Sequence, residues 1–155
     1  MIYISHRGNL EGPNKKWENH PDYIQKALDD GYDVEIDVWY KDSSFYLGHD
    51  EPTHKINVNF LKKNGLWCHA KDINTLNLML SYSEIHSFWH QEDDVTLTSR
   101  NFIWTHPGKQ LTENSIAVLP ELNNDNSITM LPKKLFGICS DFIVNYKTKD
   151  NDGLE

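Results

Sequence analysis

Two carboxylates stand two positions apart in the segment Asp33–Tyr40, where apolar residues alternate with them. Because side chains alternate between the two faces of a β-strand, Glu35 and Asp37 share one face, with Cα atoms roughly 6.6 Å apart at about 3.3 Å per residue. Two acids that point into a protein cost free energy unless a cation compensates them. The pair therefore predicts a divalent-metal site, and the alternative is an exposed edge strand with solvated acids.

Two of the eight histidines stand where a short strand is predicted to end in a turn. They are His6 in His6-Arg7-Gly8 and His49 in Gly48-His49-Asp50. Imidazole has a side-chain pKa near neutrality, so it suits proton transfer to or from an alkoxide leaving group. The two residues are predicted to be an acid/base pair, whereas most other histidines are interpreted as surface or packing residues.

Short apolar or alternating runs predict strands at about 2–6, 33–40, 45–48, 66–71, 85–89, 101–105, 115–119 and 136–142. Helices are predicted from Pro21 to Gly31 and from Asp72 to Tyr82. The connections at 90–101, 105–115 and 120–134 are rich in helix-breaking residues. The pattern predicts an α/β fold, a trimmed TIM-like (β/α) barrel with several outer helices shortened or missing, with an open α/β sheet as the alternative.

The composition is that of one globular domain, predicted to span 1–146 and to be followed by a polar tail at 147–155. The formal net charge of -8 disfavours a nucleic-acid partner or an anionic membrane surface. No window approaches the roughly 20 apolar residues of a membrane span, so a soluble, cytoplasmic protein is expected. Cys68 and Cys139 are expected to be buried thiols rather than a disulfide.

Several short segments resemble the N-terminal signature of the glycerophosphodiester phosphodiesterases, in the same order and at similar spacing. They are His6-Arg7-Gly8, Glu18-Asn19, the helix ending Ala27-Leu28 through Gly31, Glu35-Ile36-Asp37 and Gly48-His49-Asp50. The resemblance is close over about the first 55 residues. It continues weakly through Lys71, Ser87-Phe88 and Gly137-Ile138-Cys139-Ser140-Asp141.

The resemblance implies a distorted α/β barrel that holds a divalent metal, magnesium or calcium. It makes His6 and His49 the catalytic histidines and Glu35 and Asp37 metal ligands. Glu18, with Asn19 beside it, is implied to help to organise the metal and the first histidine, which makes Glu18 a further candidate metal ligand. Arg7 and Lys71 are implied to contact the phosphate, for which the guanidinium fork is well suited.

The sequence departs from the family pattern at His69, where the family usually has an acidic metal ligand two positions before the lysine. An imidazole there would shift the preference towards manganese or zinc, unless His69 binds no metal at all. The second departure is length, because the half of the barrel that would hold the substrate pocket is compressed. Candidate pocket residues at predicted strand ends are Trp39, Trp89, His90, Trp104 and His106, although the tryptophans could equally fill the core.

The expected function is metal-dependent hydrolysis of glycerophosphodiesters or similar small phosphodiesters by His/His acid–base catalysis. The nucleophile would be water or a neighbouring substrate hydroxyl, which would give a cyclic phosphate. The alternatives are a phospholipase-D-like lyase on lipid head groups, resembling the sphingomyelinase D enzymes, and a non-catalytic phosphate- and metal-binding remnant of the fold. Barrel surface left uncovered by the missing helices would favour a homodimer.

Overall fold

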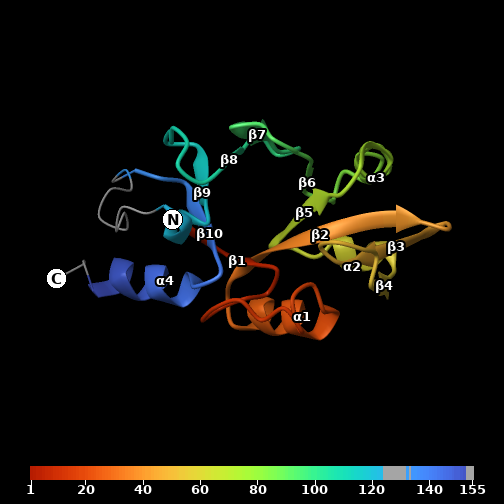
Figure 1. Ribbon diagram of the computed structural model, residues 1–155, viewed down its shortest axis with the longest axis horizontal. Coiled ribbons are helices and arrows are strands. Elements are labelled where there is room, and N and C mark those ends of the chain that lie inside the picture. Colours follow the sequence, from red (N-terminus) through yellow and green to blue (C-terminus); the bar gives the residue numbers. More distant parts are fainter. Residues whose placement is uncertain (124–131, 133, 153–155) are drawn as a thin grey trace.

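The computed structural model describes residues 1–123, 132 and 134–152 of the chain (Figure 1). Its strands are β1 (Ile2–His6), β2 (Asp33–Lys41), β3 (Ser44–Leu47), β4 (His54–Ile56), β5 (Leu66–Ala70), β6 (Ser87–Phe88), β7 (Val95–Leu97), β8 (Ile103–Thr105), β9 (Ser115–Val118) and β10 (Gly137–Ser140). Its helices are α1 (Pro21–Asp29), α2 (Val58–Leu61), α3 (Ile73–Met79) and α4 (Ile143–Asp152), with a 3₁₀ turn at η1 (Pro120–Leu122).

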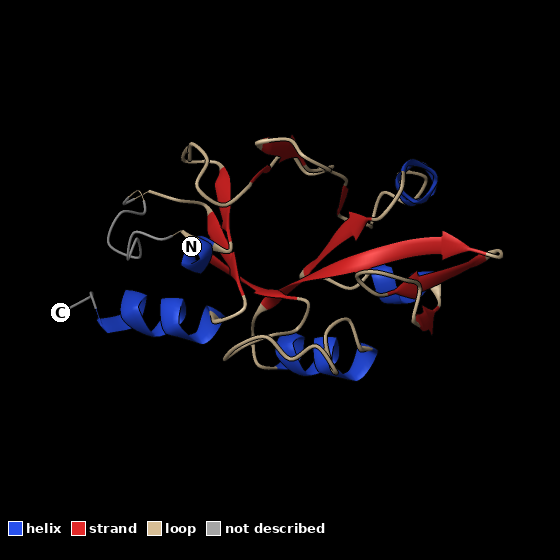
Figure 2. Ribbon diagram, viewed as in Figure 1, coloured by secondary structure: helices blue, strands red, loops and turns tan. Residues whose placement is uncertain are grey.

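The described strands form one mixed sheet that curls around a central axis (Figure 2). The main path of the sheet runs β4-β3-β2-β1-β10-β9-β8-β7, and β5 pairs with both β2 and β6. Pairing is parallel from β6 through β5, β2, β1, β10 and β9 to β8. The hairpins β2–β3, β3–β4 and β7–β8 are antiparallel. The carboxyl ends of the parallel strands therefore meet at one rim.

The prediction of a TIM-like (β/α) barrel is wrong, because the mixed sheet forms a curled half-barrel with four short α-helices in the described part of the chain. After β2 the chain turns back at once, since Asp42 and Ser43 both have positive φ, as a two-residue hairpin turn requires. After β6 it returns as the antiparallel strand β7 rather than as a helix. Hairpins thus stand where a (β/α) barrel would have outer helices. Among the described strands, β6 and β8 do not pair with each other, so the sheet is open between them.

Helix α1 begins and ends where its sequence predicts. His20 caps it by accepting a hydrogen bond from the Asp22 backbone N–H, Pro21 takes the first turn, and Gly31 follows its end with a φ of +81°. Ile24 and Ala27 bury the inner face. Helix α4 includes residues 147–152 of the predicted polar tail, whereas residues 153–155 lie outside the described part.

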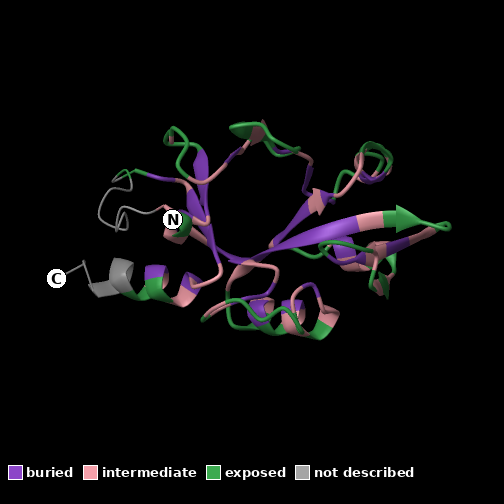
Figure 3. Ribbon diagram, viewed as in Figure 1, coloured by how far each residue is buried: buried purple, intermediate pink, exposed green. Residues whose placement is uncertain are grey.

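Buried residues run along the strands of the sheet (Figure 3). Apolar side chains pack on both faces of the sheet. Val34, Ile36 and Val38 on β2 pack with residues of α1, α2 and α3 on the outer face. On the inner face the neighbouring strands contribute a second cluster of buried residues, which consists of Ile4, Trp67, Phe88, Trp104, Ile116, Val118 and Cys139. Both cysteines are free and buried, as expected. In the described part of the chain, no helix is long and apolar enough to cross a bilayer.

A buried histidine supplies a pH-dependent part of the stability. His86 is 3% exposed, lies against the Trp67 ring and has its Nε2 atom 2.8 Å from Thr98 Oγ1. Burial, assisted by the charge of Arg100, lowers the pKa of His86 to about 4. Because the unfolded chain takes up this proton near pH 6.5, the stabilisation is complete above that pH and is lost as the pH falls from 6.5 to about 4.

We therefore expect the titration of His86 to lower the free energy of unfolding by about 3 kcal/mol when the pH falls from 7 to 4. Urea unfolding of the wild type and of His86→Gln at both pH values measures it. The variant should lose less stability over this interval than the wild type does. Parallel losses in the two proteins would contradict the assignment.

Candidate functional site

A repeated pattern on the inner face places polar groups at the rim. Ile4, Trp67, Phe88, Trp104 and Cys139 belong to one inner cluster, and two positions beyond them come His6, His69, His90, His106 and Asp141. Because side chains on one face of a strand recur every second residue, each of these polar residues follows its apolar partner towards the carboxyl end. Strand β2 adds Glu35 and Asp37 to the same rim, as predicted from their spacing.

Asp37 contacts four side chains of the polar network, those of Arg7, Asn19, His69 and Lys71. Asn19 holds it with two hydrogen bonds of 2.9 Å, one from its Nδ2 to Asp37 Oδ2 and one from the Asp37 backbone N–H to its Oδ1. Arg7 Nε lies 3.0 Å from Oδ2, and Lys71 Nζ lies 3.0 Å from Oδ1. Burial acts to raise the pKa of Asp37, but the hydrogen bond with His69 and the two cations outweigh it and hold this pKa far below its ordinary value.

Glu35 is buried beside Asp37 but has weaker partners. Its carboxylate oxygens lie 3.8 Å from His6 Nε2 and 3.7 Å from His69 Nδ1, and the buried Oε2 atom accepts no hydrogen bond from any described residue. Burial and the negative charge of Asp37 raise the pKa of Glu35. A buried carboxylate oxygen without a donor is a group that a cation would satisfy.

Glu35, Asp37 and His69 each offer a ligand atom, and these atoms lie within 4.8 Å of one another. Two carboxylates and one imidazole fit a divalent metal, and the unpaired oxygen of Glu35 supports that fit. Glu18, the fourth predicted ligand, points elsewhere. Its carboxylate lies 3.4 Å from Arg7 Nη1 and accepts a 3.0 Å hydrogen bond from Asn9 Nδ2.

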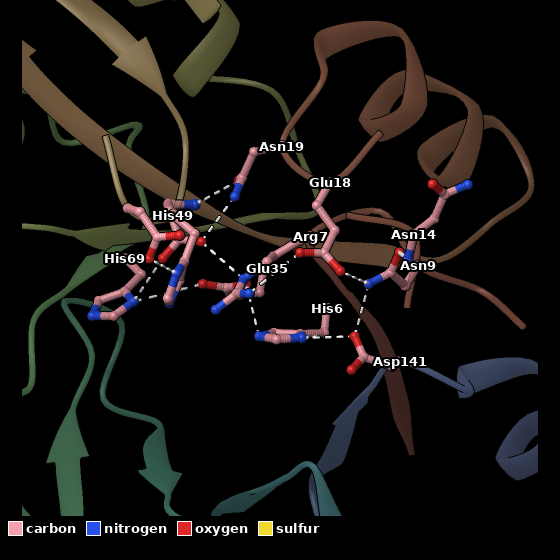
Figure 4. A network of polar contacts seen from close by, with 12 residues as sticks. His6, Arg7, Asn9, Asn14, Glu18, Asn19, Glu35, His49, His69 and Asp141 are labelled. Carbon is pink, nitrogen blue, oxygen red and sulfur yellow. Dashed lines mark hydrogen bonds and ion pairs between the residues drawn. The ribbon is translucent and has the colours of Figure 1, made fainter. Parts of the chain in front are cut away.

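His6 forms a pair with Asp141, a residue that was not proposed for the site from the sequence. His6 Nδ1 lies 2.8 Å from Asp141 Oδ1, so Nε2 is the ring nitrogen that faces Glu35 (Figure 4). Burial acts to lower the pKa of His6, but the Asp141 hydrogen bond and the charge of Glu35 raise it overall. The period-two pattern from Cys139 to Asp141 is the signal that could have identified this carboxylate.

Asp141 is itself held in position by further polar residues. Asn9 Nδ2 donates to the same Oδ1 atom over 2.8 Å, and the Asp141 backbone N–H donates to Glu121 Oε1 over 3.0 Å. Glu121 also accepts a 2.8 Å hydrogen bond from Ser140. Asn9 and Glu121 were likewise not anticipated from the sequence, because their partners are distant in the chain.

His49 stands on the turn that follows β3. Gly48 has a φ of +152°, and a Cβ atom there would lie 2.1 Å from the Glu51 carbonyl oxygen, so only glycine fits. Trp39 fixes the turn by donating from Nε1 to the Gly48 carbonyl oxygen over 2.7 Å. The His49 side chain is 44% exposed and pairs through Nδ1 with Asp50 at 2.7 Å.

A cavity of about 350 Å³ joins these groups. Its lining includes His6, Arg7, Glu35, His49, His69 and Lys71. The candidate pocket residues His90, Trp104 and His106 line it too. Trp39 and Trp89 are not part of the lining, since Trp39 holds the Gly48 turn and Trp89 packs against the outer-face cluster. A larger hollow of about 660 Å³ beside α1 holds none of the predicted site residues.

His90 and His106 follow the carboxyl ends of β6 and β8 and lie next to each other in the lining of this cavity. His106 Nε2 lies 2.9 Å from His90 Nδ1, and the His90 ring stacks on His69 with centroids 4.4 Å apart. Burial, with the nearby His69 ring, lowers the pKa of His90 to about 4 and also lowers the pKa of His106. The pair is therefore uncharged at neutral pH.

The described site thus combines three candidate metal ligands, two cations, two rim histidines with carboxylate partners and a neutral histidine pair. Comparison of the chain with protein-family models, curated proteins and solved structures found no match.

Proposed function

We propose that this protein is a metal-dependent hydrolase of small phosphodiesters such as glycerophosphodiesters. The observation that carries the proposal is the lining of one 350 Å³ cavity by the groups that such a reaction needs. Two cations for the phosphate, two of the three candidate metal ligands (Glu35 and His69) and the two histidines all line this space. Their agreement with the family resemblance in residues 1–55 adds support.

Arg7 and Lys71 would bind the non-bridging phosphoryl oxygens. Both lie beside Asp37 and line the cavity, so a phosphate there would meet two positive charges. Glu35, Asp37 and His69 would hold the divalent cation. When bound, the cation supplies Lewis-acid stabilisation of the charge that develops on the phosphoryl oxygens.

His6 and His49 would move the protons. Each ring has its Nδ1 atom paired with a carboxylate, Asp141 for His6 and Asp50 for His49, so proton transfer would occur at Nε2. One imidazole removes a proton from the attacking hydroxyl or water, and the other donates a proton to the leaving alkoxide. The carboxylate partners orient the rings and stabilise their protonated forms.

The test is hydrolysis of bis(p-nitrophenyl) phosphate and glycerophosphocholine with magnesium, calcium, manganese or zinc, beside a reaction in EDTA. We expect turnover that depends on a divalent cation and that EDTA abolishes. Product analysis separates hydrolysis from formation of a cyclic phosphate. A folded, metal-loaded protein that cleaves neither substrate would contradict the proposal.

A second candidate, a phosphate-binding module without catalytic activity, is favoured by one observation. Arg7 and Lys71 already neutralise the acidic cluster by pairing with Asp37. The acids therefore do not require a cation for charge balance. Calorimetric binding of inorganic phosphate in EDTA, together with no turnover in any metal, would favour this module over the hydrolase.

A further inference from the structure

The wall of the cavity that lies beyond the acidic cluster has a different chemistry from the cluster itself. It consists of His90, Gln91 and His106, which are hydrogen-bonding groups, and of apolar Trp104, Pro107, Val118 and Leu119. In the described lining, Glu35 is the only carboxylate, and it belongs to the candidate metal cluster. The wall therefore offers hydrogen-bonding and apolar groups and no carboxylate.

The wall begins at His90, whose ring lies against that of the candidate metal ligand His69. The His90 ring stacks on His69 at an interplanar angle of 11°, and His106 bonds to His90 from the next strand end. A phosphate bound at Arg7 and Lys71 carries two ester substituents. Since the cavity extends from these cations to the histidine pair, a substituent that enters this part of the cavity would lie against the wall.

From this geometry we propose that the wall recognises a polyhydroxylated alcohol group of the diester, such as inositol, in preference to a cationic group such as choline. This inference rests on the proposed function. The bond between His106 Nε2 and His90 Nδ1 leaves His106 Nδ1 without a hydrogen bond to any described residue, so this nitrogen can bond to a hydroxyl group. A quaternary ammonium group would meet Arg7 and Lys71 nearby, without the open aromatic cage or free carboxylate that stabilises such a cation. Trp104 is only 3% exposed, so it presents little ring face.

The experiment compares glycerophosphoinositol with glycerophosphocholine, which differ only in the alcohol group. Values of kcat/KM are measured for the wild type, His106→Leu, His106→Gln and the control His54→Leu, with bis(p-nitrophenyl) phosphate as a third substrate. We expect the wild type to favour the inositol ester at least tenfold. His106→Leu should reduce this ratio towards one, His106→Gln should retain part of it, and His54→Leu should leave it unchanged.

Equal kcat/KM for the two esters in the wild type, with good turnover of the aryl diester, would overturn this inference but not the proposed function. A parallel fall for all three substrates in His106→Leu would also overturn it, because His106 would then serve the reaction centre rather than the alcohol group. Absence of turnover of every substrate would overturn both. Thermal melts of each variant establish that the compared proteins are folded.

Discussion

We expect the His6→Ala variant to hydrolyse bis(p-nitrophenyl) phosphate roughly 10²- to 10⁴-fold more slowly than the wild type, because general acid or base catalysis by one imidazole accounts for a factor of this size. His6 opens onto the cavity with its Nε2 atom facing Glu35, and its Nδ1 atom pairs with Asp141. The measurement is kcat at saturating metal, with His54→Ala as the matched histidine control.

Asp141→Asn should lower kcat less than His6→Ala does. The amide can keep a hydrogen bond with His6 Nδ1, but it removes the negative charge that stabilises the protonated ring. The variant should also displace the pH profile of kcat to lower pH, which loss of folding alone would not do. A His6→Ala variant with wild-type kcat would contradict the assignment of His6 as a catalytic residue.

Glu35 and Asp37 of β2 should respond differently when their charges are removed in the absence of metal. Asp37→Asn should lower the free energy of unfolding by about 3–5 kcal/mol, because it leaves Arg7 and Lys71 without the carboxylate that pairs with both. Glu35→Gln should leave this free energy unchanged or raise it, since the buried Glu35 carboxylate lacks a donor on Oε2 and has a raised pKa.

Both variants should nevertheless lose affinity for Mn²⁺, because each changes one of three candidate ligands. Urea denaturation in EDTA gives the stabilities, and isothermal titration calorimetry gives the metal affinities. The pair serves as its own control, since each substitution exchanges a carboxylate for an amide on the same strand face. Equal losses of stability, or Mn²⁺ binding retained by both, would contradict the roles assigned to these two carboxylates.

Local patterns in the sequence predicted the face that a strand side chain occupies and the positions at which a helix begins and ends. The alternation in Asp33–Tyr40 placed Glu35 and Asp37 on one buried face, and the structure has them there. Helix α1 follows from Pro21 at its start and Gly31 after its end. Such features depend on neighbouring residues alone, because side-chain alternation and helix capping are set by backbone geometry over a few positions.

The path of the sheet could not be predicted in the same way. A run of alternating residues does not say whether its strand pairs parallel or antiparallel, so the runs at 33–40 and 45–48 predict barrel strands although they form the antiparallel hairpin β2–β3. Strand β7, which pairs antiparallel with β8, lies in a segment that the sequence predicts as an irregular connection. Direction depends on the turn, such as the positive φ values of Asp42 and Ser43, and on which distant strand offers free backbone groups. The predicted helices are present as α1 and α3, and hairpins stand where a (β/α) barrel would have further outer helices.

The sequence by itself determined which side chains each strand end presents, including His6, Glu35, Asp37 and His69. Only the tertiary structure decided which of them meet. His6 and Asp141 are 135 positions apart, and His90 and His106 come from two strands that do not pair with each other. Glu18 turns to Arg7 and Asn9 rather than to the acidic cluster. These contacts follow from the order and the curl of the sheet. Both depend on pairing between strands that are distant in the sequence, and no short stretch of residues specifies such pairing.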